Sequence, residues 1–223
     1  MGNQNMLRLD DFRPIVPDKT IAEIYQRAKK LYGKHIIHLN ATYQGGGVAE
    51  ILYSLVLLMN DVGVDAGWRI LHGSQAFFEV TKSFHNALQG GPLDLTDDVK
   101  RTYLEVNDTF GKFTHLRHDC VIVHDPQPLS LIRAYRKRQP WIWRCHIDLT
   151  NPHSELYHFL KGFMLKYDQV VVSSERYLKD DLPVDQRIMF PAINPLSHKN
   201  CDIDDDTIRG YIEEAGEIGR AHV

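Results

Sequence analysis

Three adjacent glycines, Gly45, Gly46 and Gly47, are the residues of this chain best suited to bind an anion. The segment before them, 35–40, has the apolar pattern of a strand, and the segment from 48 onward has that of a helix. Glycines let the backbone approach a ligand closely, and the N–H groups and dipole at the start of a helix favour negative charge. The arrangement predicts a loop that holds the phosphates of a nucleotide or nucleotide sugar, with a plain tight turn as the alternative.

A second candidate group pairs an imidazole with a carboxylate on a proline-stiffened turn, His124-Asp125-Pro126-Gln127-Pro128. A fixed carboxylate at Asp125 can accept hydrogen bonds from sugar hydroxyls or act as a base. The alternative is an Asx turn that only ends a strand.

A third group alternates with period two, which places Arg144, His146 and Asp148 on one side of an extended segment. A cation, an imidazole and a carboxylate that emerge together suit a phosphorylated or hydroxyl-rich ligand. The alternative is a buried ion pair beside a histidine whose hydrogen bonds are satisfied.

The elements that must position these residues alternate between strands and helices. Strands are expected at 35–40, 65–71, 120–124, 141–147, 169–173 and 187–190, and helices at 21–31, 48–63, 75–88, 96–110 and 156–167, with a short helix ending near 138. Several strands are apolar on both faces, which is typical of a parallel sheet covered by helices. The predicted fold class is therefore α/β, a Rossmann-like parallel sheet flanked by helices. Ligands bind at the carboxyl ends of such strands, where Asn40, Gln44 and Gln127 stand.

Composition and charge exclude several classes of function. The chain has 223 residues, of which 43% are hydrophobic and 25% charged, as in globular proteins. Its net charge of -3 gives no basic excess for nucleic acid as the main partner. No apolar run approaches the roughly 20 residues of a membrane span, and residues 1–11 lack the apolar core of a signal peptide. The three cysteines form no disulfide framework, so we expect a cytoplasmic protein.

The twelve histidines raise a metal hypothesis, because His115, His118 and His124 lie close together in the sequence. Their spacing matches neither a helical H-E-x-x-H pair nor a Cys/His finger. We therefore expect no metal ion bound by the protein.

Five segments share their order with one known family. They are HLNATYQGGGVAEIL, HDPQPL, WRCHIDLTNP, VVVSSERYL and FPAINPLSHKN. From about Leu7 to about Asn200 the chain resembles the N-terminal half of glycosyl-transferring trehalose synthases, which are retaining GT-B glycosyltransferases. The resemblance implies transfer of glucose from a nucleoside-diphosphate glucose to free glucose, giving trehalose with retention. It implies front-face attack, in which the leaving phosphate takes the acceptor proton, so positioning and charge stabilisation matter more than a protein base.

The resemblance also implies roles for particular residues. Gly46 and Gly47 fall in the loop that approaches the donor, His146 falls near the transferred sugar, and Asp125 and Gln127 face the acceptor. The expected site then consists of the catalytic residues His146 and Asp125, the donor-binding residues Gly45, Gly46, Gly47 and Arg144, and the sugar-binding residues Asn40, Gln44, Gln127 and Asp148. No tightly bound cofactor is expected, and a Mg²⁺ ion would arrive only with the donor.

The expected domain organisation is an N-terminal arm at 1–19, a Rossmann-like acceptor-binding domain at 20–200 and the start of an interdomain linker at 201–214. Residues 215–223 do not resemble the family and are expected to be a non-native tail. The nucleotide-binding domain of the family is missing, so we expect little or no transferase activity from this chain alone. Its exposed apolar surface is expected to cause self-association, including a homodimer. Two alternatives stay open: a related transferase with another sugar or sugar-phosphate acceptor, and a non-catalytic sugar- or nucleotide-binding module.

Overall fold

The structure is a computed structural model that describes residues 6–197, 199–200 and 202–214. The chain divides into two compact units, one ending at Ala192 and the other beginning at Ile193. The first unit contains all of the residues predicted to form the site.

The first unit is built on one sheet of six parallel strands, in the order β2-β1-β3-β4-β5-β6. The strands are β1 (His35–Asn40), β2 (Asp65–Ile70), β3 (Cys120–His124), β4 (Trp141–Arg144), β5 (Gln169–Val172) and β6 (Asp185–Ile188). The register pairs His38 with Ile122 and His124 with Arg144. The carboxyl ends of β1, β3 and β4 therefore meet at one edge of the sheet.

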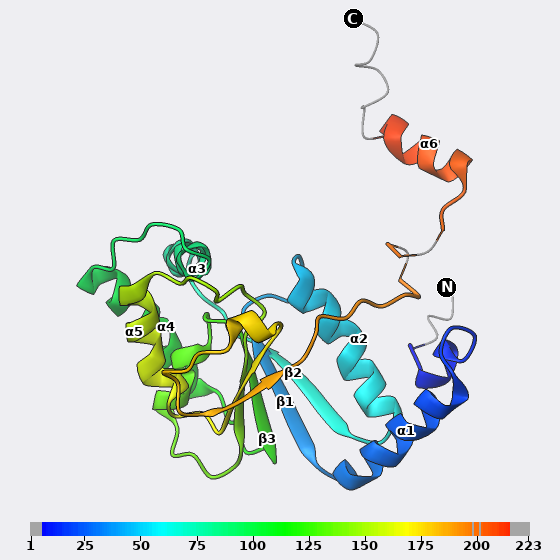
Figure 1. Cartoon of the computed structure of the whole chain (residues 1–223), viewed down its shortest axis with the longest axis horizontal. Coiled ribbons are helices and arrows are strands. Elements are labelled where there is room, and N and C mark those ends of the chain that lie inside the picture. Colours follow the sequence, from blue (N-terminus) through cyan, green and yellow to red (C-terminus); the bar gives the residue numbers. More distant parts are fainter. Residues whose placement is uncertain (1–5, 198, 201, 215–223) are drawn as a thin grey trace, which may run out of the picture. The chain divides into compact units, whose positions relative to one another are not determined.

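Helices cover both faces of this sheet. In the first unit they are α1 (Asp18–Ala28), α2 (Gly47–Asp61), α3 (Gln75–Leu88), α4 (Asp97–Phe113) and α5 (Ser154–Met164). Figure 1 shows α1 and α2 on one face of the sheet and α3, α4 and α5 on the other. The predicted class, an α/β Rossmann-like parallel sheet flanked by helices, is confirmed.

Two hydrophobic cores separate along these faces because the side chains of each strand alternate. The larger core joins Leu39 of β1 to the helices α3–α5 and buries Trp141 and Trp143 completely. The smaller core joins Ile36 of β1 to α1 and to the N-terminal arm. Leu9 of that arm is buried in it, and its N–H donates to the Asp61 carboxylate at the end of α2, at 2.8 Å.

Element boundaries differ from the prediction in the second half of the sheet. The short helix expected to end near 138 is a 3-10 helix, η3 (Leu129–Ala134), followed by extended backbone at Tyr135. The strand expected at 141–147 ends at Arg144. The Cys145 N–H still donates to the Val171 carbonyl of β5, but the His146 N–H turns to the Asp125 carboxylate. The last strand begins two residues earlier than expected. Thr96 caps α4, since its hydroxyl accepts from the Val99 N–H.

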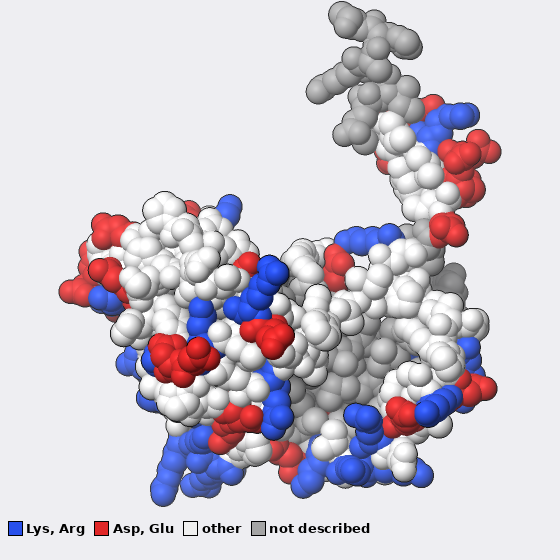
Figure 2. Space-filling view, in the orientation of Figure 1, with Lys and Arg blue, Asp and Glu red and all other residues white. Residues whose placement is uncertain are grey.

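The second unit contains α6 (Asp205–Glu214), which lies in the segment expected to begin a linker. The expected tail at 215–223 lies outside the described residues. On the face shown in Figure 2, acidic and basic side chains are interspersed. Within the described part of the chain, every helix is too short or too polar to cross a bilayer.

Candidate functional site

Three histidines at the carboxyl ends of β1, β3 and β4 form a continuous hydrogen-bonded chain. Nδ1 of His38 lies 3.0 Å from Nε2 of His124, and Nδ1 of His124 lies 3.0 Å from Nε2 of His146. The ring centroids are 5.3 Å apart at both steps. His38 and His124 are buried, whereas His146 is partly exposed. The chain of histidines therefore runs from the interior of the protein, at His38, to the partly exposed His146.

Burial keeps these imidazoles neutral. It lowers the pKa of His38 and that of His146 to about 4. Burial also lowers the pKa of His124 well below its usual value, and the neighbouring histidines and the Arg144 guanidinium lower it further. Near neutral pH each ring therefore carries one proton, and each hydrogen bond in the chain has one donor and one acceptor.

Asp125 follows β3 and fixes the start of the loop that carries His146. Its Oδ1 accepts from the His146 N–H at 2.7 Å, and its carbonyl accepts from Trp143 Nε1 at 2.9 Å. Its φ of 60° makes it the one non-glycine residue in the left-handed region within the described part of the chain. Such strain persists only where surrounding contacts impose it, and it is common at functional sites.

The carboxyl group of Asp125 titrates near neutral pH. Burial raises its pKa to about 7, against the opposing effects of the His146 N–H and the Arg144 guanidinium. A carboxyl group with this pKa can donate or accept a hydrogen bond at physiological pH, which suits contact with a sugar hydroxyl.

Helix α4 holds the loop after β3 and the start of η3 through three hydrogen bonds. The Tyr103 hydroxyl donates to the Pro126 carbonyl at 2.7 Å and accepts from the Ser130 N–H at 3.1 Å. The Asn107 amide donates to the Gln127 carbonyl at 3.0 Å. These bonds hold the backbone of the predicted site residue Gln127, whose side chain is half-buried.

The glycine loop lies between β1 and α2, as predicted. Gly45 and Gly46 have φ angles of 77° and 83°, and none of the three glycines has an atom within 4 Å of where a Cβ would stand. Gly46 is the N-cap of α2 and supplies no side-chain cap. The start of a 15-residue helix thus meets an exposed, side-chain-free loop, which is the geometry that binds phosphate.

Asn40 shapes the entrance to this loop. Its amide nitrogen donates to the Thr42 carbonyl at 2.6 Å, and its amide oxygen accepts from Trp68 Nε1 at 2.7 Å. The Thr42 hydroxyl donates to the Gln44 carbonyl at 2.6 Å. Both amide atoms of Asn40 therefore have hydrogen-bond partners within the protein, whereas Gln44 is exposed.

Arg144 and Asp148 do not lie beside His146 on one extended segment, because the strand ends at Arg144. The buried Arg144 donates from Nη2 to the Met189 carbonyl at 2.6 Å and to the Ser173 hydroxyl at 3.2 Å. Asp148 is exposed and accepts from the Thr150 N–H at 2.7 Å. Binding of a diphosphate by Arg144 would require the Met189 segment to move, so its predicted role, like that of Asp148, stays a prediction.

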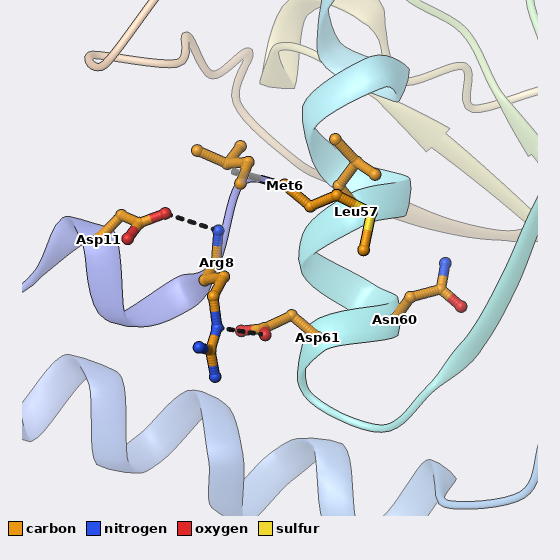
Figure 3. A pocket seen from close by; sticks show the side chains of 7 residues that line it. Met6, Arg8, Asp11, Leu57, Asn60 and Asp61 are labelled. Atoms are coloured by element: carbon orange, nitrogen blue, oxygen red, sulfur yellow. Dashed lines mark hydrogen bonds and ion pairs between the residues drawn. The ribbon is translucent and has the colours of Figure 1, made fainter. Parts of the chain in front are cut away.

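A cavity beside the N-terminal arm lies away from this site. It has a volume of about 600 Å³ and is lined by Met6, Leu7, Arg8, Asp11, Leu57, Asn60 and Asp61. Figure 3 shows Arg8 bridging the arm to Asp61 at the end of α2. The glycine loop is at the other end of that helix, which is about 22 Å long at 1.5 Å per residue. This cavity is therefore a junction between the arm and α2, and it contains none of the predicted site residues.

The hydrogen-bonded role of His38 and His124 was not predicted from the sequence. Each is a histidine near the end of an otherwise apolar, buried strand, and that pattern was the available signal. Their nitrogens point at one another, and within the described residues no group of three or more His, Cys, Asp or Glu is placed to hold a metal ion. His115 and His118, which shared the metal hypothesis with His124, precede β3 and do not join this chain.

Comparison with known proteins identifies the family of this chain. Residues 38–179 match the family described as trehalose synthase, N-terminal domain. The trehalose synthases of Thermococcus litoralis and Pyrococcus furiosus are each 48% identical over 209 residues, covering 92% of this chain and 51% of the relative. The trehalose synthase of Rubrobacter xylanophilus is 37% identical over 216 residues, covering 93% of this chain and 52% of the relative.

The chain thus spans about half the length of the curated relatives it matches. The match from 38 to 179 includes the glycine loop, the three histidines and the Asp125 turn. The chain belongs to the trehalose synthase family, of which it represents the N-terminal domain.

Proposed function

We propose that this domain is the acceptor-binding half of a retaining glycosyltransferase. The reaction is transfer of glucose from a nucleoside-diphosphate glucose to free glucose, giving trehalose. The observation that carries the proposal is that an open glycine loop, a half-buried aspartate and a histidine follow the carboxyl ends of the adjacent strands β1, β3 and β4. Open α/β sheets bind their ligands at this edge.

The roles divide between the two sides of this edge. The loop from Gly45 to Gly47 and the start of α2 face the donor diphosphate, where helix N–H groups stabilise negative charge. Asp125 and Gln127 face the acceptor glucose, and His146 lies between them and the transferred sugar. With a pKa of about 7, Asp125 can hydrogen-bond a hydroxyl group of the acceptor without fully removing the proton of that hydroxyl group.

The reaction depends on a second domain that binds the nucleotide. The curated trehalose synthases are about twice as long as the stretch matched here, which supports placing the rest of the donor site in that half. We accordingly expect the chain alone to bind glucose weakly and to form no trehalose. A Mg²⁺ ion would enter with the diphosphate, and we assign no residue of this domain to it.

A transfer assay on two proteins tests this function. One is the present chain, and the other joins it to the C-terminal half of the Pyrococcus furiosus trehalose synthase, which is 48% identical over the matched part. Each receives nucleoside-diphosphate glucose and glucose, and trehalose and free nucleoside diphosphate are measured. Trehalose from the fusion alone is the expected result.

One variant and the pattern of products make the assay decisive. A fusion carrying Gly47→Val should form at least tenfold less trehalose, because the added side chain stands where the donor phosphates approach and Gly47, unlike Gly46, has no positive φ. Release of nucleoside diphosphate without trehalose would point to another acceptor. No turnover in a folded, nucleotide-binding fusion would contradict the proposed transferase and favour a sugar-binding module.

A sugar-phosphate acceptor remains the second candidate, because Arg144 lies at this edge of the sheet. The buried position of Arg144 and its bond to the Met189 carbonyl favour free glucose as the acceptor. Offering glucose 6-phosphate in the same assay separates the two candidates. Only one of trehalose and trehalose phosphate should accumulate.

A further inference from the structure

The chain of histidines has a direction, because a neutral imidazole carries only one N–H. His124 stands in the middle and contacts one ring with each of its nitrogens. It must donate to one neighbour and accept from the other. The tautomers of His38 and His146 are therefore coupled to that of His124, and the whole chain has only two polarised arrangements.

The two arrangements differ at the buried end. Nε2 of His38 is buried and has no hydrogen-bond partner among the described residues. If the protons point inward along the chain, this atom is an unpaired buried N–H. If they point outward, it is a bare lone pair and every N–H except the last is bonded within the chain. Orphaned N–H groups are rare in protein interiors, which favours the outward arrangement.

We propose that His38 and His124 are positioning residues that hold His146 in the tautomer with its proton on Nδ1. In this arrangement His38 donates to His124, His124 donates to His146, and the Nδ1–H of His146 is the free end of the chain. That nitrogen has no hydrogen-bond partner among the described residues and is not among their buried unpaired atoms. His146 is thereby presented as a donor to an oxygen atom of the bound sugars.

Neighbouring charged groups do not compete for the ends of the chain. The Asp125 carboxylate accepts from the backbone N–H of His146 rather than from its ring. The Arg144 guanidinium donates to Met189 and Ser173 and lowers the pKa of His146, which disfavours an imidazolium. That the Nδ1–H of His146 donates to a bound sugar rests on the proposed transferase function. The tautomer of His146 does not depend on that function.

The tautomer can be measured directly on this chain by NMR after labelling of histidine with ¹⁵N. Two-bond correlations between ring nitrogens and carbon-bound protons distinguish a protonated Nδ1 from a protonated Nε2. A His146→Gln variant identifies the His146 signals by their loss. We expect His146 to be protonated at Nδ1 with an excess of about tenfold, the ratio for a bias of about 1.4 kcal/mol, close to one hydrogen bond.

Two substitutions at His38 separate positioning from packing. His38→Leu removes the first donor, so the chain loses its direction and the Nδ1 tautomer of His146 should decrease several-fold. His38→Asn keeps an amide N–H close to the place of Nδ1 and should restore the wild-type signal. A role in packing alone would leave the His146 signals unchanged in both variants.

The spectrum of the unmodified chain already decides the proposal, even if the leucine variant does not fold. Protonation of His146 at Nε2, or an even mixture of the two tautomers, would overturn it. Because no substrate is needed, this result is independent of the transfer assay. An Nδ1–H tautomer in a protein that makes no trehalose would leave the positioning intact and refute the transferase alone.

Discussion

At the scale of single residues, the glycine loop contains a matched pair for testing backbone strain. Gly46 has a φ of 83° and a ψ of 152°, a region that is essentially restricted to glycine. Gly47 lacks a positive φ and begins α2, and a Cβ would meet nothing within 4 Å at either position. Gly46→Ala should therefore lower the free energy of unfolding by about 1–3 kcal/mol through strain alone. Gly47→Ala should leave it unchanged or raise it by up to about 1 kcal/mol.

Urea denaturation of both variants measures this difference. Equal losses at the two positions would mean that contacts of the loop, rather than the conformation of Gly46, determine its stability. The pair also separates strain from substrate contact in the transfer assay, because Gly47→Ala adds a methyl group without the backbone penalty.

The buried histidines and Asp125 give the fold a pH dependence with two opposing signs. The pKa values of His38 and His146 are about 4 in the folded protein and 6.5 in the unfolded chain, and that of His124 is lowered too. The unfolded chain binds more protons at these sites, so stability rises with pH between about 4 and 6.5. The pKa of Asp125 rises from 3.8 to about 7 on folding, so this group lowers stability as pH rises through that interval.

Three groups act against one, so the net free energy of unfolding should increase from pH 4.5 to pH 6.5. A single group contributes at most about 1.4 kcal/mol per pH unit. Asp125→Asn removes the opposing group and keeps an acceptor for the His146 N–H, so the increase should become steeper. Denaturation curves at several pH values test this, and a profile that falls with pH in the unmodified chain would contradict the burial of the histidines.

At the scale of elements, hydrogen bonds from α4 hold the loop after β3 in place. The fully buried Tyr103 hydroxyl makes one bond to that loop, at Pro126, and one to η3, at Ser130. Phe at this position keeps the packing but loses both bonds. Tyr103→Phe should cost about 1–3 kcal/mol for each buried group left unpaired. In the fusion protein it should also raise the KM for glucose, because the Asp125–Gln127 backbone loses its support.

Tyr135→Phe is the control for this element. Its hydroxyl donates to the Thr114 carbonyl at 2.6 Å, in a half-buried position away from the site. It should cost about 0.5–1.5 kcal/mol and leave the KM for glucose unchanged. The same effect of both variants on KM would show that global stability, and not the loop, controls acceptor binding.

At the scale of the whole molecule, the edge strand β6 ends in an exposed apolar segment. Ile188, Met189 and Phe190 are 41%, 60% and 76% exposed. Such a segment beside an open sheet edge favours association. We expect the sedimentation coefficient to increase with protein concentration, and the double substitution Met189→Gln and Phe190→Gln to reduce the increase several-fold.

Phe113 provides the matched control, because it is 81% exposed on α4, in a different part of the sequence. Phe113→Gln should leave association unchanged. A clean monomer at every concentration would rule out self-association through this edge.

The order and type of the elements followed from local patterns in the sequence. The apolar runs predicted all six strands to within three residues at either end. The last strand, short and mostly exposed, was placed two residues late because its pattern is weak. The three motifs around Gly46, Asp125 and His146 also carried enough information to indicate the family, which the comparison confirmed.

What only the tertiary structure decided is which of these residues touch. The alternation that predicted Arg144, His146 and Asp148 on one side assumed a strand that continues, but β4 ends at Arg144 and the His146 N–H bonds to the Asp125 side chain instead of a neighbouring strand. The contact between His38 and His124 joins positions 86 residues apart and depends on which strands are neighbours in the sheet. The sequence determined the chemistry at the end of each strand, because that chemistry is local. The strand order determined how the groups combine, because hydrogen bonds between distant residues form only once the whole sheet is assembled.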